Sequence, residues 1–286
     1  MQTILRKKPN LFAFDLDGTL LNSKKELTDI SIHNLQQIFN SGSKIAFASG
    51  RLKSSIEQYL QMCKFPISVL SLNGAAVYMD SQNGNKLIYN APLPETYANY
   101  LIDYTEKNRI ACNYYFNDKL YAVKNTATEQ WINFYYTQTR TEYNCLESLN
   151  RFLGNSPSKI IFVGPPDDMD RQQHYFSQLW GDSVYICRTW DYYLEFLNPK
   201  ANKGLGLAAL AQSYHISIDD VISFGDAEND IPMLKTAGFS IAVQNASQEV
   251  KDIAQRVSPR SNDENMIASE WEFIKKTINY SEDSAK

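Results

Sequence analysis

Short uninterrupted apolar runs recur along the chain, and longer segments with helical periodicity lie between them. The runs occupy residues 11–14, 44–48, 67–72, 221–224 and 239–243. Strands that are covered on both faces of a parallel sheet have runs of this kind, without alternation. One helical segment extends from a candidate N-cap at Thr28 to Gly42, with apolar residues at the spacing of one helix face. The order of these segments predicts an α/β fold with a doubly wound, Rossmann-like parallel sheet.

The middle of the chain has a different pattern, with hairpin signals between strand-like segments. Asn117 and Asp118 join "IACNYYF" to "KLYAV", which is typical of a tight antiparallel hairpin. Between residues 92 and 191 we expect a helix, two strands, a helix, a strand, a helix and two more strands. The parallel pattern resumes at Lys203. We therefore predict a core formed by residues 1–91 and 192–286, interrupted by an inserted α+β domain at 92–191.

Composition and charge argue against several classes of partner. The net charge is −4, and no basic block is longer than "RKK" at residues 6–8, so we expect no nucleic-acid polymer as a partner. No apolar run approaches the roughly 18 residues that span a bilayer, and the N-terminal charges follow the apolar piece, unlike those of a secretory signal. The four cysteines lack metal-binding and disulfide spacings. These features predict a cytoplasmic protein without a membrane partner, and they indicate no particular oligomeric state.

Polar and acidic residues follow the apolar runs, at the points where the predicted strands end. Asp15 and Asp17 come after the first run, Ser49 after the second, Asn73 after the third, and Asp226 after "VISFG". In open α/β sheets, ligands bind beyond the carboxyl ends of the strands. Because these strand ends converge at one edge of the sheet, they predict a single site.

The acidic residues of this site need a cation. Each close pair of carboxylates costs on the order of a few kcal/mol at an effective dielectric constant of about 20. Oxygen ligands without histidine or cysteine favour a hard ion, and Mg²⁺ typically uses one or two carboxylates together with phosphate and water. We expect the carboxylates of Asp15 and Asp226 to bind Mg²⁺, with the backbone carbonyl of Asp17 as a further ligand.

Three simpler interpretations of the acidic loop compete with this one. An EF-hand-like loop would place its required glycine at residue 20, which is a leucine, and would follow a helix rather than a strand. An ordinary capped turn accounts for "DLDGT" alone, but not for "GDAEND" as well. Solvated surface acids are disfavoured by the apolar strands that precede them. The metal-site hypothesis therefore explains more of the pattern.

Four segments carry a resemblance to a known family. They are "DLDGTLL" at residues 15–21, "ASGR" at 48–51, "NPKANKG" around Lys203 and "GDAENDIPML" at 225–234. Together they resemble the haloacid dehalogenase superfamily, and specifically its Cof-type phosphatases with a C2-type cap. The resemblance implies that the inserted domain is a cap that selects the substrate. One departure is that Asn265 and Met266 stand where Cof-type chains commonly have a glycine.

The resemblance also implies roles for individual residues. Asp15 would be the nucleophile that accepts a phosphoryl group, and Asp17 the acid that protonates the leaving oxygen and then activates water. Asp230 would orient Lys203 or a water on the metal. Arg51 fits equally well as a structural partner of strand-end carbonyls and is not included among the catalytic residues. The phosphate would be bound by Ser49, Gly50, Asn73, Lys203 and Asn229.

The function implied is Mg²⁺-dependent hydrolysis of a small phosphorylated metabolite through an aspartyl-phosphate intermediate. Sugar phosphates, nucleotides and pyridoxal phosphate all fit, and aromatic residues of the insert such as Trp131 and Trp190 could stack on a sugar or a ring. Glu195 either faces the substrate or forms a salt bridge at the hinge. A phosphomutase is the first alternative, because the same intermediate can be passed to a second hydroxyl. A non-catalytic phospho-ligand sensor is the second, although such proteins lack an acid at the position of Asp17.

Overall fold

The computed structural model describes residues 8–283, which form two compact units. The first unit contains residues 8–90 and 202–283, and the second is Ala91–Ala201. The insert was expected to end at residue 191, but the second unit continues to Ala201. The reason is that the last predicted strand of the insert, β11 (Tyr193–Leu197), pairs with strands of the second unit's own sheet.

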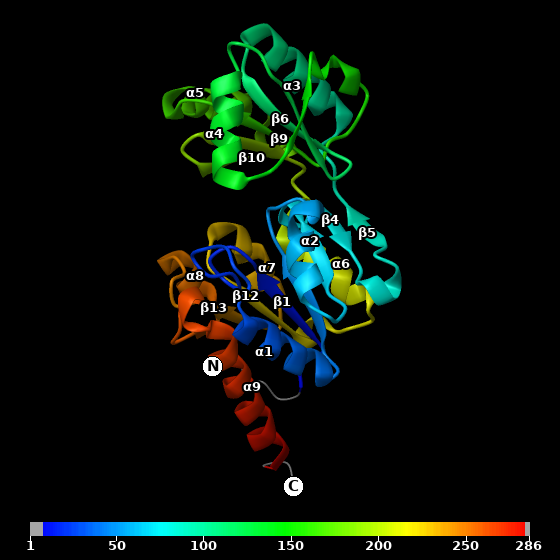
Figure 1. Cartoon of the computed structure of the whole chain (residues 1–286), viewed down its shortest axis with the longest axis vertical. Coiled ribbons are helices and arrows are strands. Elements are labelled where there is room, and N and C mark those ends of the chain that lie inside the picture. The colour runs from blue at the N-terminus through cyan, green and yellow to red at the C-terminus, as the bar shows by residue number, and fades with distance from the viewer. Residues whose placement is uncertain (1–7, 284–286) are drawn as a thin grey trace. The chain divides into compact units, whose positions relative to one another are not determined.

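The first unit is built on a mostly parallel sheet, as the apolar runs predicted (Figure 1). The strand order is β14-β13-β12-β1-β2-β3-β4-β5, and only the pairs β3–β4 and β4–β5 are antiparallel. The chain leaves β1 in one direction through β2 and returns on its other side at β12, so the switch in strand order lies beside β1. The strands are β1 (Leu11–Asp15), β2 (Lys44–Ala48), β3 (Ser68–Ser71), β4 (Ala76–Tyr78), β5 (Leu87–Asn90), β12 (Val221–Gly225), β13 (Phe239–Ala242) and β14 (Arg256–Val257).

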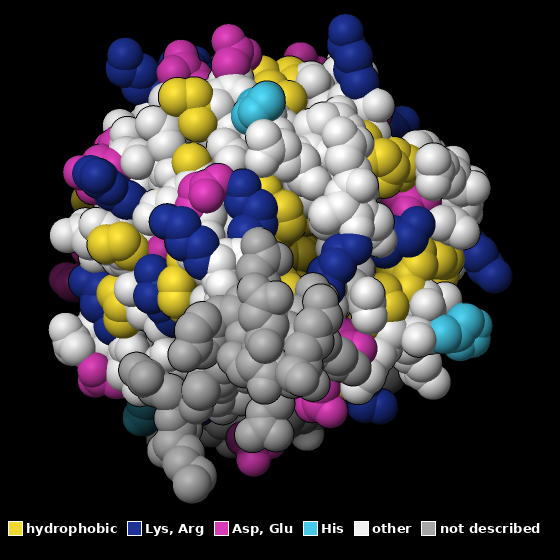
Figure 2. Space-filling model, turned by 90° about the horizontal axis from the view of Figure 1, so that it is seen from below, with side chains coloured by type: hydrophobic (Ala, Val, Ile, Leu, Met, Phe, Trp, Pro, Cys, Tyr) yellow, Lys and Arg dark blue, Asp and Glu magenta, His cyan; other side chains and the backbone are white. Residues whose placement is uncertain are grey.

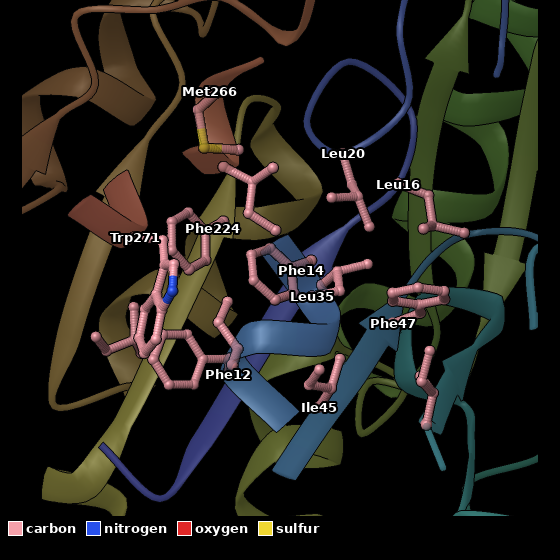
Figure 3. Packing of buried hydrophobic residues seen from close by; sticks show 14 of the residues in the cluster. Phe12, Phe14, Leu16, Leu20, Leu35, Ile45, Phe47, Phe224, Met266 and Trp271 are labelled. Carbon is pink, nitrogen blue, oxygen red and sulfur yellow. The ribbon is translucent and has the colours of Figure 1, made fainter. Parts of the chain in front are cut away.

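Helices cover both faces of this sheet because alternate residues of β1 point to opposite sides. Phe12 and Phe14 pack under α1 (Asp29–Asn40), α2 (Lys53–Met62) and α9 (Met266–Asp283). Leu11 and Ala13 pack under α6 (Lys203–Ser213) and α7 (Ile231–Thr236), beside which lies α8 (Gln248–Ile253). Figure 3 shows the packing on the α1, α2 and α9 side of the sheet. There the rings of Trp271 and Phe12 pack edge to face, with their centroids 5.9 Å apart.

The predicted boundaries of α1 are confirmed by its caps. The side chain of Thr28 accepts a hydrogen bond from the backbone N–H of Ser31 at 3.1 Å, which satisfies one of the unpaired donors of the first turn. The helix ends at Asn40, and Gly42 follows with a φ of +91°. This conformation is open to glycine without a steric penalty. The sequence signals at both ends therefore act as expected.

The second unit has a mixed sheet of its own, with strand order β10-β11-β9-β6-β7-β8. The predicted hairpin joins β6 and β7 through Asn117 and Asp118, which both have positive φ. The edge strand β8 was not predicted, and it pairs in parallel with β7. Its elements are α3 (Glu95–Asn108), β6 (Ala111–Phe116), β7 (Lys119–Val123), α4 (Glu129–Thr139), β8 (Tyr143–Leu146), β9 (Lys159–Val163), α5 (Pro166–Trp180), β10 (Tyr185–Trp190) and β11.

The face drawn in Figure 2 is mixed in charge, and the described helices are short or polar. On the face drawn in Figure 2, basic and acidic side chains of the described residues are interspersed rather than gathered by sign. Across residues 8–283, every helix is too short or too polar to span a bilayer.

Candidate active site

The loop after β1 turns sharply enough to bring its backbone against a second acidic loop. Gly18 has a φ of +85°, and a Cβ atom there would lie 2.4 Å from Oδ2 of Asp226. Both the dihedral angle and the close approach require glycine. The "DG" of the first loop and the Asp226 of the second therefore meet at one place, as the convergence of strand ends predicted.

Asp15 lies in a buried acidic cluster that surrounds one lysine. The Nζ atom of Lys203 donates hydrogen bonds of 2.6 Å to both Asp15 and Asp230. Lys203 and Asp230 are fully buried, and Asp15 is only 5% exposed. Asp226 completes the cluster and accepts a hydrogen bond of 2.7 Å from the hydroxyl of Thr19. Ligand oxygens of the three carboxylates lie within 4.8 Å of one another.

The cluster carries more negative than positive charge, and the pKa values show it. Burial, the nearby Asp230 and the nearby Asp226 raise the pKa of Asp15 well above its usual value, although Lys203 opposes this. Burial and Asp230 raise the pKa of Asp226 to about 6, against the hydrogen bond from Thr19. Burial alone would lower the pKa of Lys203, but Asp15 and Asp230 raise it instead. A further cation would reduce the electrostatic repulsion at Asp15 and Asp226 and lower their pKa values.

The donor set fits a hard divalent cation. Asp15, Asp226 and Asp230 offer only carboxylate oxygens. Asp230 is the least available, because its Oδ1 accepts from Lys203 and its Oδ2 from the backbone N–H groups of Asp226 and Ala227. Asp15 and Asp226 therefore have more carboxylate oxygen available to an ion than Asp230, which holds the lysine and the second loop in place.

Asp17 stands apart from this cluster and is engaged by two cations. Its carboxylate accepts 2.7 Å hydrogen bonds from Nε and a terminal nitrogen of Arg51, and a third of 2.7 Å from Nζ of Lys25. Burial would raise the pKa of Asp17, but Arg51 and Lys25 lower it to about 2. The sequence suggested Arg51 as a partner of strand-end carbonyls; its side chain instead binds Asp17. Lys25 was missed, since nothing in its spacing signals this contact.

The predicted phosphate-binding residues are linked through their own hydrogen bonds. Ser49 directly follows Ala48, the residue of β2 that pairs with Asp15. The backbone N–H of Asn73 donates to the carbonyl of Ser49 at 2.9 Å, and the side-chain amide of Asn229 donates to Oδ1 of Asn73 at 3.0 Å. A Cβ atom on Gly50 would lie 3.1 Å from that same Oδ1. Loops after three different strands are thus held in contact.

Known proteins resemble this chain over most of its length. Residues 12–270 match the model of the haloacid dehalogenase-like hydrolases. The chain belongs to this family. It is 26% identical to 5-amino-6-(5-phospho-D-ribitylamino)uracil phosphatase YitU from Bacillus subtilis, over 92% of this chain and 97% of the relative. It is 30% identical to HMP-PP phosphatase from Cronobacter sakazakii, over 84% of this chain and 86% of the relative.

Two solved structures have the same fold as this chain. The crystal structure of TM0651 from Thermotoga maritima matches with a TM-score of 0.84 and 26% identity, over 93% of this chain and 97% of that one. A sugar phosphatase structure described as subclass IIB matches with a TM-score of 0.74 at 20% identity, which shows the fold alone. The protein is accordingly a phosphatase of the haloacid dehalogenase superfamily.

The departure of this haloacid dehalogenase-like chain at residue 265 is accommodated without a glycine. Asn265 adopts a φ of +58°, a left-handed conformation that asparagine tolerates better than most residues. The neighbouring Asn262 donates from its backbone N–H to Asn245 and from its side chain to the carbonyl of Leu21, both at 3.0 Å. Asn245 in turn donates to the carbonyl of Gly18 at 2.8 Å. The C-terminal loop therefore closes against the loop that carries Asp17.

Glu195 was expected either to face the substrate or to form a salt bridge at the hinge, and in the structure its partner is Lys159. Glu195 accepts a hydrogen bond of 3.0 Å from Nζ of Lys159, and both residues are 4% exposed. Lys159 begins β9 and Glu195 lies in β11, so the pair belongs to the sheet of the second unit. Glu195 therefore does form a salt bridge, as one alternative predicted. The predicted location at the hinge was wrong, because the salt bridge joins two strands of one sheet.

Proposed function

We propose that this protein is a Mg²⁺-dependent phosphatase that hydrolyses small phosphomonoesters through an aspartyl-phosphate on Asp15. The observation that carries the proposal is the separation of two carboxylates only two residues apart. Asp15 lies in the buried cluster with Lys203, whereas Asp17 is bound by Arg51 and Lys25. Two carboxylates with such different surroundings suit two different chemical roles.

Asp15 is the proposed nucleophile. One of its oxygens attacks phosphorus while the bond from phosphorus to the ester oxygen breaks, which leaves the phosphoryl group on Asp15. Lys203 places a positive charge against Asp15 and the incoming phosphate, and the buried surroundings strengthen that attraction. We propose that Ser49, Gly50, Asn73 and Asn229 bind the phosphoryl oxygens, since little covalent assistance is needed in phosphoryl transfer beyond positioned donors and charges.

Asp17 is the proposed acid and base. Because Arg51 and Lys25 lower the pKa of Asp17 to about 2, it must first take up a proton, which it then gives in the first step to the departing ester oxygen, so that the product leaves as an alcohol. In the second step it takes a proton from the water that attacks phosphorus, so that phosphate is released and Asp15 is regenerated. The names of the two relatives, both phosphatases, favour water rather than a second hydroxyl as the acceptor.

The metal ligands proposed are the carboxylates of Asp15 and Asp226 and the backbone carbonyl of Asp17. When bound, Mg²⁺ neutralises charge on the phosphoryl oxygens and on the acidic cluster. The close approach of Gly18 to Asp226 supports a role for the peptide between residues 17 and 18. Asp230 contributes by orienting Lys203 and the backbone of the second loop.

We infer that the second unit is the cap that selects the substrate, and that the substrate is a small phosphorylated metabolite with a ring or a sugar. A relative acts on a phosphorylated uracil compound, as its name states. Many aromatic residues of the second unit are buried core, but Trp190 is 43% exposed and its ring lies parallel to that of Phe134 at 5.6 Å. Exposed rings of this kind stack on planar or sugar groups.

A panel of phosphorylated metabolites tests the proposal. Sugar phosphates, nucleotides and pyridoxal phosphate are assayed for phosphate release with Mg²⁺ and, as a control, with chelator. We expect release that requires Mg²⁺, and no release by Asp15→Asn. The matched control is Asp252→Asn, an exposed carboxylate on α8, which should be fully active. Turnover by Asp15→Asn would refute the nucleophile, and an isomerised sugar phosphate without release would identify a phosphomutase.

A further inference from the structure

One turn of the chain contacts both loops that carry the proposed metal ligands. It comprises residues 243–247, between β13 and α8, and we call it the bridging turn (Figure 1). The side-chain amide of Asn245 donates a hydrogen bond of 2.8 Å to the carbonyl of Gly18. In the same turn, the backbone N–H of Ser247 donates to the carbonyl of Asp226 at 3.1 Å. A single short segment therefore holds the backbone of one loop relative to the backbone of the other.

The amide of Asn245 can make its contacts in only one orientation. Its Oδ1 accepts a hydrogen bond of 3.0 Å from the backbone N–H of Asn262. If the amide were turned over, its NH₂ group would face this N–H and its oxygen would face the carbonyl of Gly18, so both contacts would become repulsive. Asn262 is itself held, because its side chain donates to the carbonyl of Leu21 at 3.0 Å. The C-terminal loop thus sets the direction in which Asn245 donates.

Gly18 is the point of the loop after β1 that most needs such support. Glycine has more backbone freedom than any other residue, and Gly18 has a φ of +85°. The N–H of the following residue, Thr19, reaches the carbonyl of Leu16 at 3.3 Å, which is longer than the roughly 2.7–3.2 Å that is usual for such a bond. The carbonyls of Asp17 and Gly18 lie on neighbouring peptides that share the Cα of Gly18. A shift of the Gly18 carbonyl therefore moves the carbonyl of Asp17 as well.

The loop after β1 does not depend on Asn245 for its folding. Leu16, Leu20 and Leu21 are buried in the hydrophobic core and anchor the loop from the inside. Gly18 has no side chain that can anchor the tip of the loop in this way. Asn245 is exposed, so its hydrogen bond competes with water and adds little to stability. What the hydrogen bond supplies is a fixed position for the carbonyl of Gly18.

We propose that Asn245 is a positioning residue for the metal site, because it places the carbonyl of Asp17 where this oxygen and the carboxylate of Asp226 both reach one Mg²⁺. The inference rests on the proposed function, in which the carbonyl of Asp17 is a metal ligand. Mg²⁺ demands nearly ideal octahedral geometry, whereas Ca²⁺ accepts longer and less regular contacts. A misplaced carbonyl should therefore weaken the binding of Mg²⁺ more than the binding of Ca²⁺.

Calorimetric titration of the full chain with each cation, in the absence of substrate, tests the inference. For Asn245→Ala we expect the Kd of Mg²⁺ to rise about tenfold, as is typical when a residue that supports a metal ligand is removed. The Kd of Ca²⁺ should rise less than about threefold. An unchanged Kd of Mg²⁺ would overturn the inference. An equal loss of affinity for the two cations would also overturn it, since general damage to the site weakens both.

Two variants separate the contact with Gly18 from other effects on the same loops. Gln244→Ala changes an exposed neighbour in the bridging turn and should leave both Kd values unchanged. Asn262→Ala removes the hydrogen bond to the carbonyl of Leu21 but keeps the backbone N–H that orients Asn245, so the Kd of Mg²⁺ should stay within about threefold. A loss as large as that of Asn245→Ala would instead assign the effect to closure of the whole loop, against the inference.

The thermal midpoint shows whether Asn245→Ala is folded. In chelator it should fall by no more than about 4 °C, because only an exposed hydrogen bond is lost.

Asp226→Asn distinguishes failure of the inference from failure of the proposed function. If Asp226 is a metal ligand, Asp226→Asn weakens Mg²⁺ binding far more than tenfold. That result together with an unchanged Kd in Asn245→Ala would refute only the role of Asn245. Unchanged Mg²⁺ binding by Asp226→Asn would refute the proposed metal site, and the inference with it.

Discussion

Each unit of the molecule buries a lysine against carboxylates, and the two groups differ in their charge balance. In the first unit, Lys203 is surrounded by Asp15, Asp226 and Asp230, so one ammonium faces three carboxylates. In the second unit, Lys159 faces Glu195 at 3.0 Å. The second group is neutral by itself, whereas the first is neutral only with additional positive charge.

The comparison teaches that charge excess, rather than burial, marks the functional group. The Lys159 pair is supplemented by the ring of Tyr115, which lies 5.0 Å from the ammonium, and by a hydrogen bond of 2.5 Å between the hydroxyls of Tyr115 and Tyr135. A neutral pair of this kind specifies packing between β9, β11 and α4. The acidic cluster, in contrast, raises the pKa values of two carboxylates, which is characteristic of sites that bind a cation or do chemistry.

Removal of Lys203 gives the largest expected effect. Lys203→Met leaves Asp15 and Asp230 buried without their cation, and breaking a buried pair in this way costs about 3–5 kcal/mol. Loss of a positioned charge at the phosphoryl group should also lower kcat by about 10²–10³-fold. Urea unfolding and phosphatase assays measure the two effects. Lys235→Met, at an exposed position of α7, is the control and should change neither.

Asp226→Asn tests the charge excess directly. The amide keeps an oxygen that can accept from Thr19, so the fold is preserved while one negative charge is removed. In chelator, we expect the thermal midpoint to rise, because repulsion in the cluster is relieved. In saturating Mg²⁺ at about 100 times its Kd, the unmodified protein should gain about 2.7 kcal/mol and the variant much less. A lower midpoint of the variant in chelator would show that the cluster carries no excess charge.

Much of this site could be predicted from the sequence, because it depends on strand ends. Asp15, Ser49 and Asp226 each follow an apolar run, and parallel strands bring such ends to one edge. The same logic predicted the core sheet. The contact between Lys25 and Asp17 could not be predicted. It depends on the positive φ of Lys25 within a loop and on the hydrogen bond that Tyr59 of α2 donates to the carbonyl of Lys25.

The second unit was predicted less completely for a related reason. Strand β8 is an edge strand whose residues are exposed or half-buried, so it lacks the apolar run that marked the other strands. The predicted end of the insert at residue 191 lies ten residues before the end of the second unit at Ala201. The strand Tyr193–Leu197 was predicted as part of the insert although it lies beyond residue 191, and its pairing with β9 and β10 places it in the second unit.

Lys159→Met is the matched experiment in the second unit. The variant leaves Glu195 buried without its partner, and we expect a loss of about 3–5 kcal/mol in the stability of that unit. The double variant Lys159→Met/Glu195→Gln removes both charges and should recover most of the loss. Neither should change the concentration of Mg²⁺ that gives half-maximal activity. A shift in that concentration would mean that the neutral pair contributes to the metal site.

Thr19→Val is expected to have the smallest effect. It tests whether a hydrogen bond to Asp226 supports metal binding by the acidic cluster. The hydroxyl of Thr19 donates to Asp226 and is buried, and valine has nearly the same shape. Without this hydrogen bond, Asp226 is less well oriented, and loss of such a supporting contact typically weakens metal affinity by about 10–100-fold. The substitution does not change the charge of Asp226. We therefore expect kcat at saturating Mg²⁺ to stay constant, while the Mg²⁺ concentration that gives half-maximal activity rises. Titration of activity with Mg²⁺ measures this shift, and an unchanged requirement with a reduced kcat would mean that Thr19 supports the loop around Gly18 rather than the metal ligand.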